Sequence, residues 1–307
     1  MDLMNKMIGR ISEFIVGHEE LLKLMYIALI TDGHIMLEGP TGVGKTYTAK
    51  LFAQSIGGKF KRIQIVPDML PSDILGSYYY DISRGEWVFR EGPIFANVIL
   101  VDELNRAPPR TQAAFIEAMQ ERQVTIEGNT FQLPQPFMVL ATQMPIGSEG
   151  TYPLTPVHID RFSYYYPLDY PNFDEEVEII SRIDRIENVN IEPVASLEEI
   201  NMVKNEVLKV HVSRKVKEYI VNIVNFIRKQ NEVLIGPSPR ASIWLLKASR
   251  ALAYMNAEEY VVPDHVKQLA KYVLLHRVKI KSEYEVDGVK PIDIIDRALN
   301  SVEVPKV

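Results

Sequence analysis

Cysteine is absent from the sequence, and this absence excludes several kinds of site together. None of the 307 residues can form a disulfide, ligate zinc as a thiolate or act as a thiol nucleophile. Long hydrophobic runs are also missing, because no segment approaches the roughly 20 apolar residues of a membrane-spanning helix. Residues 1–17 lack the apolar core of a signal peptide. We therefore expect a soluble, cytoplasmic protein without a membrane span.

A strong excess of charge is absent as well. The formal net charge is −6, from 34 basic and 40 acidic residues, which gives no sign of a general polyanion-binding surface. The six histidines show no metal-ligand spacing, and we interpret them as structural or exposed side chains. The hydrophobic content of 47% is typical of a globular protein with a substantial core.

The segment from Gly39 to Thr46 reads GPTGVGKT and fits the phosphate-binding pattern G-x-x-x-x-G-K-[ST]. Its glycines let backbone N–H groups approach phosphate oxygens, and Lys45 is placed to reach the β- and γ-phosphates. The Thr46 hydroxyl is a hard oxygen ligand that suits Mg²⁺. The residues predicted to bind the nucleotide here are Gly39, Pro40, Thr41, Gly42, Val43, Gly44, Lys45, Thr46 and Tyr47.

A second segment, Val98 to Glu103, reads VILVDE and predicts an apolar strand that ends in two carboxylates. We expect Asp102 to hold Mg²⁺ through its water shell and Glu103 to polarise the attacking water. The two segments together predict ATP and Mg²⁺ as cofactors and ATP hydrolysis as the reaction.

Strands alternate with helices in the first half of the chain. The predicted strands are His34–Glu38, Lys61–Val66, Asn97–Val101, Phe137–Thr142 and Phe162–Leu168. Arg110–Glu121 has its apolar residues at helical spacing. This alternation predicts an α/β fold, in which a mostly parallel sheet lies between helices and binds its ligand at the carboxyl ends of the strands.

The pattern changes after Pro171. Amphipathic helices are predicted over Asp174–Ile186, Leu197–Leu208, Ser213–Gln230, Arg240–Asn256 and Pro263–Leu275. We therefore predict a nucleotide-binding domain at residues 1–171 and an all-helical domain at residues 172–307.

Two β-hairpins are predicted within the first domain. Val124–Leu133 alternates on both sides of a Gly-Asn turn, and Ser77–Phe89 has β-prone arms around residues 83–85. Tyr78, Tyr79, Tyr80 and Trp87 are large side chains to leave near solvent. The hairpins are either surface decorations or elements that line a pore or a partner surface.

The combination of phosphate loop, acidic strand end, hairpins and C-terminal helices resembles an AAA+ ATPase of the branch with an insert in helix 2. The local sequence resembles the MoxR family. The segments that carry this likeness are EGPTGVGKT (38–46), RIQIVPDMLPSDILG (62–76), EGPIFANVILVDELNRAPPRTQAAFIEAMQERQVTIEG (91–128), EGTYPLTPVHIDRF (149–162) and GPSPRASIWLLKASRALA (236–253). The resemblance covers nearly the whole chain and implies a phosphate-loop sheet domain followed by a helical lid.

The resemblance also implies roles for single residues. Val16 and Gly17, in FIVGH, match the element that closes over adenine. Arg161, in IDRF, matches the arginine finger that reaches the γ-phosphate held by a neighbouring subunit. Arg240, in SPRAS, matches sensor 2, which touches the phosphates and couples the lid to the nucleotide state. Gln64 lies where a polar side chain could hold Glu103 out of position.

One position departs from the family pattern. MoxR proteins usually have Asn after the ATQ of the fourth strand, whereas this chain has Met144. A thioether cannot donate the hydrogen bond that would orient the attacking water. We therefore expect Thr142 or Gln143 to take that role, and turnover to be slow.

By resemblance, the chain forms a homo-oligomeric ring, a hexamer, and acts as a chaperone that remodels or matures partner proteins, with von Willebrand factor A domain proteins as expected partners. Two alternatives remain open. Related rings move nucleic acid, although Val124–Leu133 contains no Lys or Arg to contact phosphates. An ATP-gated scaffold that hardly hydrolyses ATP is the other alternative.

Overall fold

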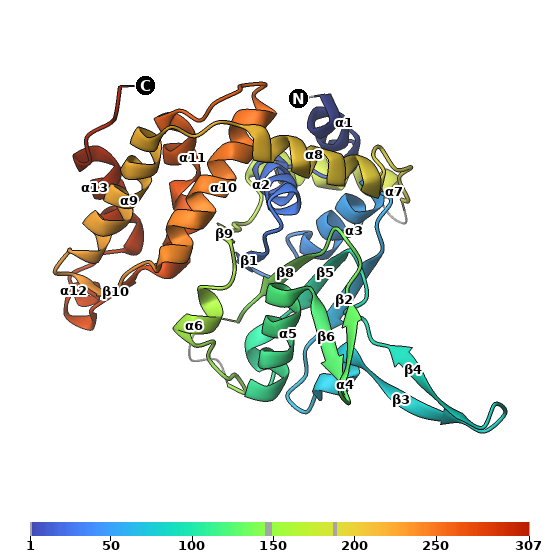
Figure 1. The fold of residues 1–307 in the computed structure, drawn as a ribbon. Helices are drawn as coiled ribbons and strands as arrows, with labels where there is room; N and C mark the ends of the chain where they lie inside the picture. The colour runs from blue at the N-terminus through green and yellow to red at the C-terminus, as the bar shows by residue number, and fades with distance from the viewer. Residues whose placement is uncertain (1, 145–148, 187–188, 307) are drawn as a thin grey trace.

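The computed structural model describes residues 2–144, 149–186 and 189–306, and its centre is a five-stranded sheet. The strands lie in the order β2 (Phe60–Gln64), β5 (Val98–Asp102), β8 (Met138–Thr142), β1 (Ile35–Glu38) and β9 (Tyr164–Pro167), and every neighbouring pair is parallel (Figure 1). Gln64 pairs with Asp102 and Leu37 with Thr142, so the carboxyl ends of these strands meet at one edge. The predicted parallel α/β sheet is therefore confirmed.

Helices cover both faces of this sheet. Along β5, Val98 and Leu100 pack on the side of α1 (Asp2–Ser12), α2 (Glu19–Ile30) and α3 (Lys45–Ser55). Ile99 and Val101 alternate to the other side, which α5 (Pro109–Glu121) covers together with the short α4 (Pro71–Leu75). Burial on both faces explains why this strand has no polar residue before Asp102.

Helices dominate the chain after β9. They are α7 (Phe173–Ile186), α8 (Leu197–Lys209), α9 (Arg214–Arg228), α10 (Pro239–Met255), α11 (Pro263–Leu274), α12 (Ser282–Val286) and α13 (Pro291–Ser301). Pro239, Pro263 and Pro291 each occupy the first helical position, where no backbone N–H is needed. The apolar pattern did not predict the two-stranded ribbon of β10 (Val233–Ile235) and β11 (Lys279–Ile280), because each strand is too short to show alternation.

The two main hydrophobic cores are divided by the sheet. The core on the α1–α3 side continues without a break into α8–α11 and α13, whereas the second core lies beneath α5. A boundary at residue 171 thus remains a proposal about domains, because it does not separate two cores. No helix in the described part of the chain has the length and apolar character needed to cross a membrane.

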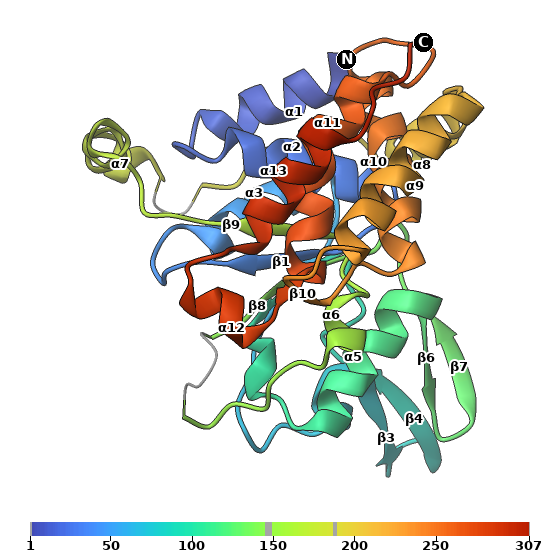
Figure 2. The same cartoon turned by 90° about the vertical axis from the view of Figure 1, so that its left-hand side faces the viewer.

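Both predicted hairpins are present and lie side by side (Figures 1 and 2). They are β3 (Gly76–Asp81) with β4 (Glu86–Glu91), and β6 (Gln123–Ile126) with β7 (Asn129–Gln132). The second turn is formed by Glu127 and Gly128, one residue before the predicted Gly-Asn pair. Both residues have positive φ, 49° and 83°, as the tightest hairpin turns require.

Candidate active site

The loop between β1 and α3 forms the floor of the candidate site. Gly44 precedes α3 with a φ of 80°, a left-handed conformation that glycine adopts at little cost. A Cβ added to Gly39 would collide with the carbonyl oxygen of Leu168. The Lys45 ammonium donates to the carbonyl oxygens of Gly39 and Pro40 at 3.1 and 3.0 Å. The loop therefore wraps closely around one cation at a helix N-terminus, an arrangement that suits a phosphate.

A cavity of about 700 Å³ opens above this loop. It collects predicted site residues from the loop and from the ends of β5 and β8: Gly39, Pro40, Thr41, Gly42, Gly44, Lys45, Thr46, Tyr47, Asp102, Glu103 and Gln143. Partial burial lowers the pKa of Lys45, while the carboxylates of Asp102 and Glu103 act in the opposite direction. The cavity thus combines the cations of Lys45 and Arg62 with three carboxylates, those of Glu38, Asp102 and Glu103.

Asp102 and Glu103 are both held by basic or amide side chains. The side chain of Asp102 is only 11% exposed, and its Oδ2 accepts from Arg62 Nε at 2.6 Å. Glu103 Oε2 accepts from Arg106 Nη1 at 3.0 Å and from Gln64 Nε2 at 3.4 Å. The predicted contact between Gln64 and Glu103 is therefore present, and its role as a switch stays a prediction.

The donor set fits Mg²⁺ held together with a nucleotide. Thr46 and Asp102 offer a hydroxyl and a carboxylate, and Mg²⁺ usually takes one or two protein ligands, several waters and substrate phosphates. Within residues 2–144, 149–186 and 189–306, no group of three or more His, Asp or Glu side chains could hold a metal ion. Metal binding would thus depend on the nucleotide, with Thr46 and Asp102 as the protein's contribution.

Hydrogen bonds to residues at the ends of both neighbouring strands hold the end of β8 in place. Thr142 Oγ1 accepts from the Glu103 backbone N–H at 2.9 Å, and Gln143 Nε2 donates to Glu38 Oε2 at 3.1 Å. The buried Asn105 bonds both the N–H and the C=O of Met144, at 2.9 and 3.0 Å. The backbone of residue 144 is therefore fixed, while its side chain lines the cavity.

A second cavity of about 460 Å³ adjoins the first and shares Gly42, Gly44, Tyr47 and Tyr170 with it. Val16 and Gly17 line it together with Val43, and their contact with a base stays a prediction. Its size and partly aromatic wall suit a nucleobase. The further lining includes Phe14, His18, Tyr166, Glu175 and Ile179.

Sequence reasoning missed several of these residues. His18 lines the second cavity, and its Nδ1 lies 2.8 Å from Thr48 Oγ1. Burial lowers the pKa of His18. No local pattern relates His18 to Glu175 of α7, which are distant in the sequence. A signal for Arg62 did exist, because Arg62 and Gln64 alternate onto one face of a predicted strand.

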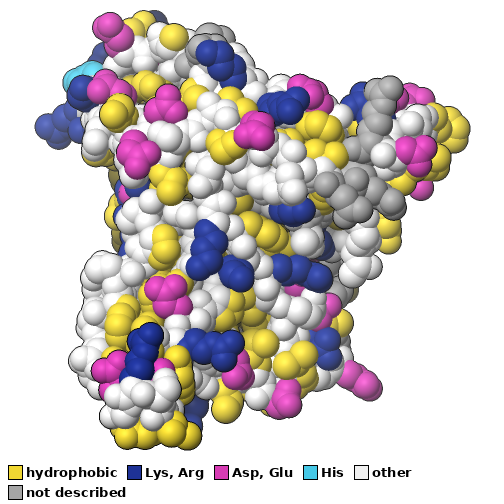
Figure 3. Space-filling view, turned by 90° about the vertical axis from the view of Figure 1, so that its right-hand side faces the viewer, with side chains coloured by type: hydrophobic (Ala, Val, Ile, Leu, Met, Phe, Trp, Pro, Cys, Tyr) yellow, Lys and Arg dark blue, Asp and Glu magenta, His cyan; other side chains and the backbone are white. Residues whose placement is uncertain are grey.

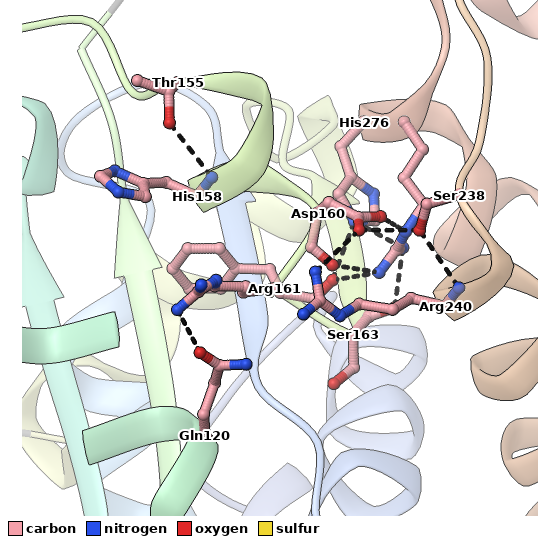
Figure 4. Close-up of polar contacts among 11 residues, drawn as sticks. Gln120, Thr155, His158, Asp160, Arg161, Ser163, Ser238, Arg240 and His276 are labelled. Carbon is pink, nitrogen blue, oxygen red and sulfur yellow. Dashed lines mark hydrogen bonds and ion pairs between the residues drawn. The ribbon is translucent and has the colours of Figure 1, made fainter. Parts of the chain in front are cut away.

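Arg161 and Arg240 lie together, away from the phosphate loop. Arg161 follows α6 (Pro156–Ile159) and donates to Gln120, while Arg240 Nη1 lies 3.2 Å from Asp160 Oδ2 (Figure 4). Arg240 lines a separate hollow of about 260 Å³. Burial, together with the positive charge of Arg240, lowers the pKa of Arg161, while the charges of Asp160 and Glu121 act in the opposite direction. Within one chain, Arg240 thus contacts Asp160 and does not line the phosphate cavity. The SPRAS motif predicted a contact with the phosphates and did not predict this pairing.

Known proteins are similar to this chain in sequence and fold. A family model described as "ATPase family associated with various cellular activities (AAA)" matches residues 34–164, and an AAA lid domain model matches residues 226–298. The uncharacterised protein YeaC of Bacillus subtilis is 40% identical over 99% of this chain and 95% of its own length. Chaperone MoxR1 of Mycobacterium tuberculosis is 37% identical over 99% of this chain and 83% of its own length.

Among solved structures, the chain is similar to a crystal structure of a predicted ATPase from Cytophaga hutchinsonii. The TM-score is 0.93 at 35% sequence identity, and the match covers 99% of this chain and 96% of the other. The likeness therefore extends from the sheet through the helical part.

Proposed function

The chain belongs to the MoxR family of AAA+ ATPases, and from this premise we propose that it hydrolyses ATP with Mg²⁺ and uses the energy to remodel or mature partner proteins. The observation that carries the proposal is the meeting of Lys45, Asp102 and Glu103 at one cavity. Lys45 holds the phosphates, and Glu103 activates the attacking water. Thr46 and Asp102 would hold Mg²⁺, which would offset the negative charge of the phosphates when bound.

Assembly into a ring, a hexamer by resemblance, is part of this proposal. Arg161 and Arg240 carry positive charge on a surface away from the chain's own phosphate loop, which supports a role at the nucleotide of a neighbouring copy. α7 projects from the body (Figure 2) and leaves apolar side chains in solvent, among them Phe173 at 81% and Ile180 at 67% exposure. Exposed apolar surface of this kind supports a contact with another chain.

The joined hairpins are the proposed contact with the partner protein. Their far end exposes Tyr79, Tyr80, Ile82 and Trp87. Figure 3, where this end faces the viewer at the lower left, shows hydrophobic side chains mixed with a few charges of both signs. Exposed aromatic side chains are frequent anchors in protein interfaces, whereas phosphate contacts need uncompensated cations. This surface supports a protein partner, and proteins with a von Willebrand factor A domain are the proposed class.

A trapped variant tests the proposal. Glu103→Gln keeps the shape of the side chain but removes the base, so we expect hydrolysis to fall by about 10²- to 10⁴-fold with ATP still bound. Glu117→Gln, an exposed change on α5, is the control.

The trapped protein, recovered from its native extract with ATP, should retain a von Willebrand factor A protein or one dominant client. Recovery of nucleic acid that resists moderate salt, without a protein client, would point to a nucleic-acid motor. ATP-dependent assembly by an unmutated protein that releases negligible phosphate would instead support the scaffold alternative.

A further inference from the structure

Arg62 forms an ion pair with the carboxylate that is proposed to hold Mg²⁺. It lies on β2, next to β5, and its Nε is 2.6 Å from Asp102 Oδ2. The two partners differ in exposure, because the Arg62 side chain is 49% exposed and that of Asp102 only 11%. A carboxylate this deeply buried needs a compensating cation. Arg62, a residue of the same chain, supplies such a cation at 2.6 Å.

We propose that Arg62 is a built-in substitute for the metal: it neutralises Asp102 until Mg²⁺ arrives with ATP, and Mg²⁺ then displaces it. This inference rests on the proposed ATP-binding function. Mg²⁺ and the guanidinium group compete because both need the oxygens of the same carboxylate. Displacement is inexpensive on the side of Arg62, since its side chain is already 49% exposed and the freed guanidinium group reaches water at once.

The same arginine links Asp102 to the second carboxylate of the site. Arg62 Nη2 donates to Gln64 Oε1 at 2.8 Å, and Gln64 Nε2 in turn donates to Glu103 Oε2 at 3.4 Å. When Arg62 leaves Asp102, Gln64 loses the donor that orients its amide. Binding of the metal thereby changes the hydrogen bond that Gln64 donates to Glu103. Neither Arg62 nor Gln64 has to contact the nucleotide for this effect.

The test measures equilibrium binding of a fluorescent ATP analogue with Mg²⁺ and with EDTA, in the full-length chain. Without Arg62, Asp102 repels the phosphates unless Mg²⁺ is present. We therefore expect Arg62→Gln to raise the ratio of the two affinities by about two- to fivefold, without weakening the affinity measured with Mg²⁺. Lys61→Gln removes the same charge from the neighbouring exposed position of β2 and should leave the ratio unchanged.

Two results would overturn the inference. Weaker binding of the Mg²⁺ complex by Arg62→Gln would mean that Arg62 contacts the phosphates, and an unchanged ratio would mean that the ion pair has no effect on the metal. Arg62→Lys keeps the charge and should hold the ratio near that of the unmutated protein, which also covers a failure of Arg62→Gln to fold. If the unmutated protein does not bind the analogue at all, the proposed function itself fails.

Discussion

Glu103 has a backbone conformation that few residues other than glycine adopt. Its φ is 60°, and such left-handed geometry costs of order 1–3 kcal/mol. The surrounding structure maintains it, because the Glu103 N–H donates to Thr142 and its carboxylate is bonded by Arg106 and Gln64. Strain of this kind often occurs where a side chain must point in a functionally required direction. At Glu103 it turns the carboxylate into the phosphate cavity.

Residue 144 offers a direct test of the slow-turnover prediction. Its backbone is held by Asn105, so an asparagine there would present its amide to the same cavity that Met144 lines. We expect Met144→Asn to raise the rate of ATP hydrolysis about tenfold, which corresponds to one added hydrogen bond of about 1.4 kcal/mol in the transition state.

Phosphate release at saturating ATP is the measurement for this variant. Met202→Asn on α8 is the matched control, because that side chain is 65% exposed and outside the cavity. An unchanged rate in Met144→Asn would show that another group orients the water.

At the scale of elements, His34 joins three parts of the sheet domain. It precedes β1, its Nδ1 accepts from the Val139 N–H of β8 at 3.0 Å, and its Nε2 lies 2.9 Å from Met119 O of α5. Because Nδ1 accepts, Nε2 carries the proton and the ring is neutral. Complete burial lowers the pKa of His34 to about 4, although the bond to Met119 and the charge of Asp32 oppose this shift.

This histidine predicts a loss of stability in mild acid. The unfolded chain binds a proton at His34 below a pKa of about 6.5, whereas the folded chain does not until about 4, so stability falls as the pH drops through this window. We expect His34 to account for about 2 kcal/mol of lost unfolding free energy between pH 7 and pH 5. His276, whose pKa burial lowers well below its usual range, adds to the same trend.

Urea unfolding at a series of pH values measures this effect. His34→Gln should have a shallower dependence of stability on pH than the unmutated chain, whatever its stability at pH 7. His211→Gln, at an exposed position, is the matched control. Equal slopes for His34→Gln and the unmutated chain would exclude His34 as the source.

The two hairpins are joined into one unit by aromatic side chains. Phe89 of β4 stacks on Phe131 of β7 with ring centroids 4.2 Å apart, and Tyr78 packs on Phe89 at 5.5 Å. Asn129 Nδ2 donates to the Tyr78 hydroxyl at 3.0 Å. A displacement of either hairpin is therefore transmitted to the other.

Removal of one ring should separate the hairpins. We expect Phe131→Ala to weaken their packing by at least about 0.5–1.5 kcal/mol, the typical contribution of one aromatic pair. Amide hydrogen exchange of β3 and β4 should become several-fold faster, while exchange in β5 and β8 stays the same. Thr130→Ala, at an exposed position of β7, is the control, and no change in β3 and β4 would mean that the hairpins are independent.

At the scale of the whole molecule, Asp160 connects the sheet part with the helical part. It follows α6, and its Oδ2 accepts from Ser238 Oγ at 2.7 Å (Figure 4). Its Oδ1 accepts from Arg277 Nε at 2.9 Å. Arg240 adds a third contact. Because Arg161 is the next residue, both arginines of this surface lie beside this connection.

Mixed assemblies test whether these arginines act on a neighbour. Arg161→Ala and Glu103→Gln should each be inactive alone, since each lacks one half of every shared site. In an equal mixture, about a quarter of random neighbour pairs combine an intact Glu103 with an intact Arg161, so ATP hydrolysis should partly return. The control is a mixture of Lys45→Ala with Glu103→Gln, whose defects lie on the same side of the site. A mixture of the first pair that stays inactive would place the action of Arg161 elsewhere.

The strands of the sheet, both hairpins and the phosphate loop could be predicted from the sequence alone. These features depend on neighbours along the chain: glycine spacing, alternation within a strand, and helix starts at proline. The carboxylates Asp102 and Glu103 were predictable for the same reason, because Asp102 ends a buried apolar strand and Glu103 directly follows it.

Contacts between side chains that are distant in the sequence could not be predicted and became visible in the fold. Arg62 binds Asp102, α7 closes the second cavity beside His18, and Arg240 lies next to Arg161 rather than at the phosphate loop. The exact hairpin turn was also missed, by one residue. Such contacts depend on strand order and on how the helical part packs against the sheet, and these follow from burial of the whole apolar surface rather than from any local pattern.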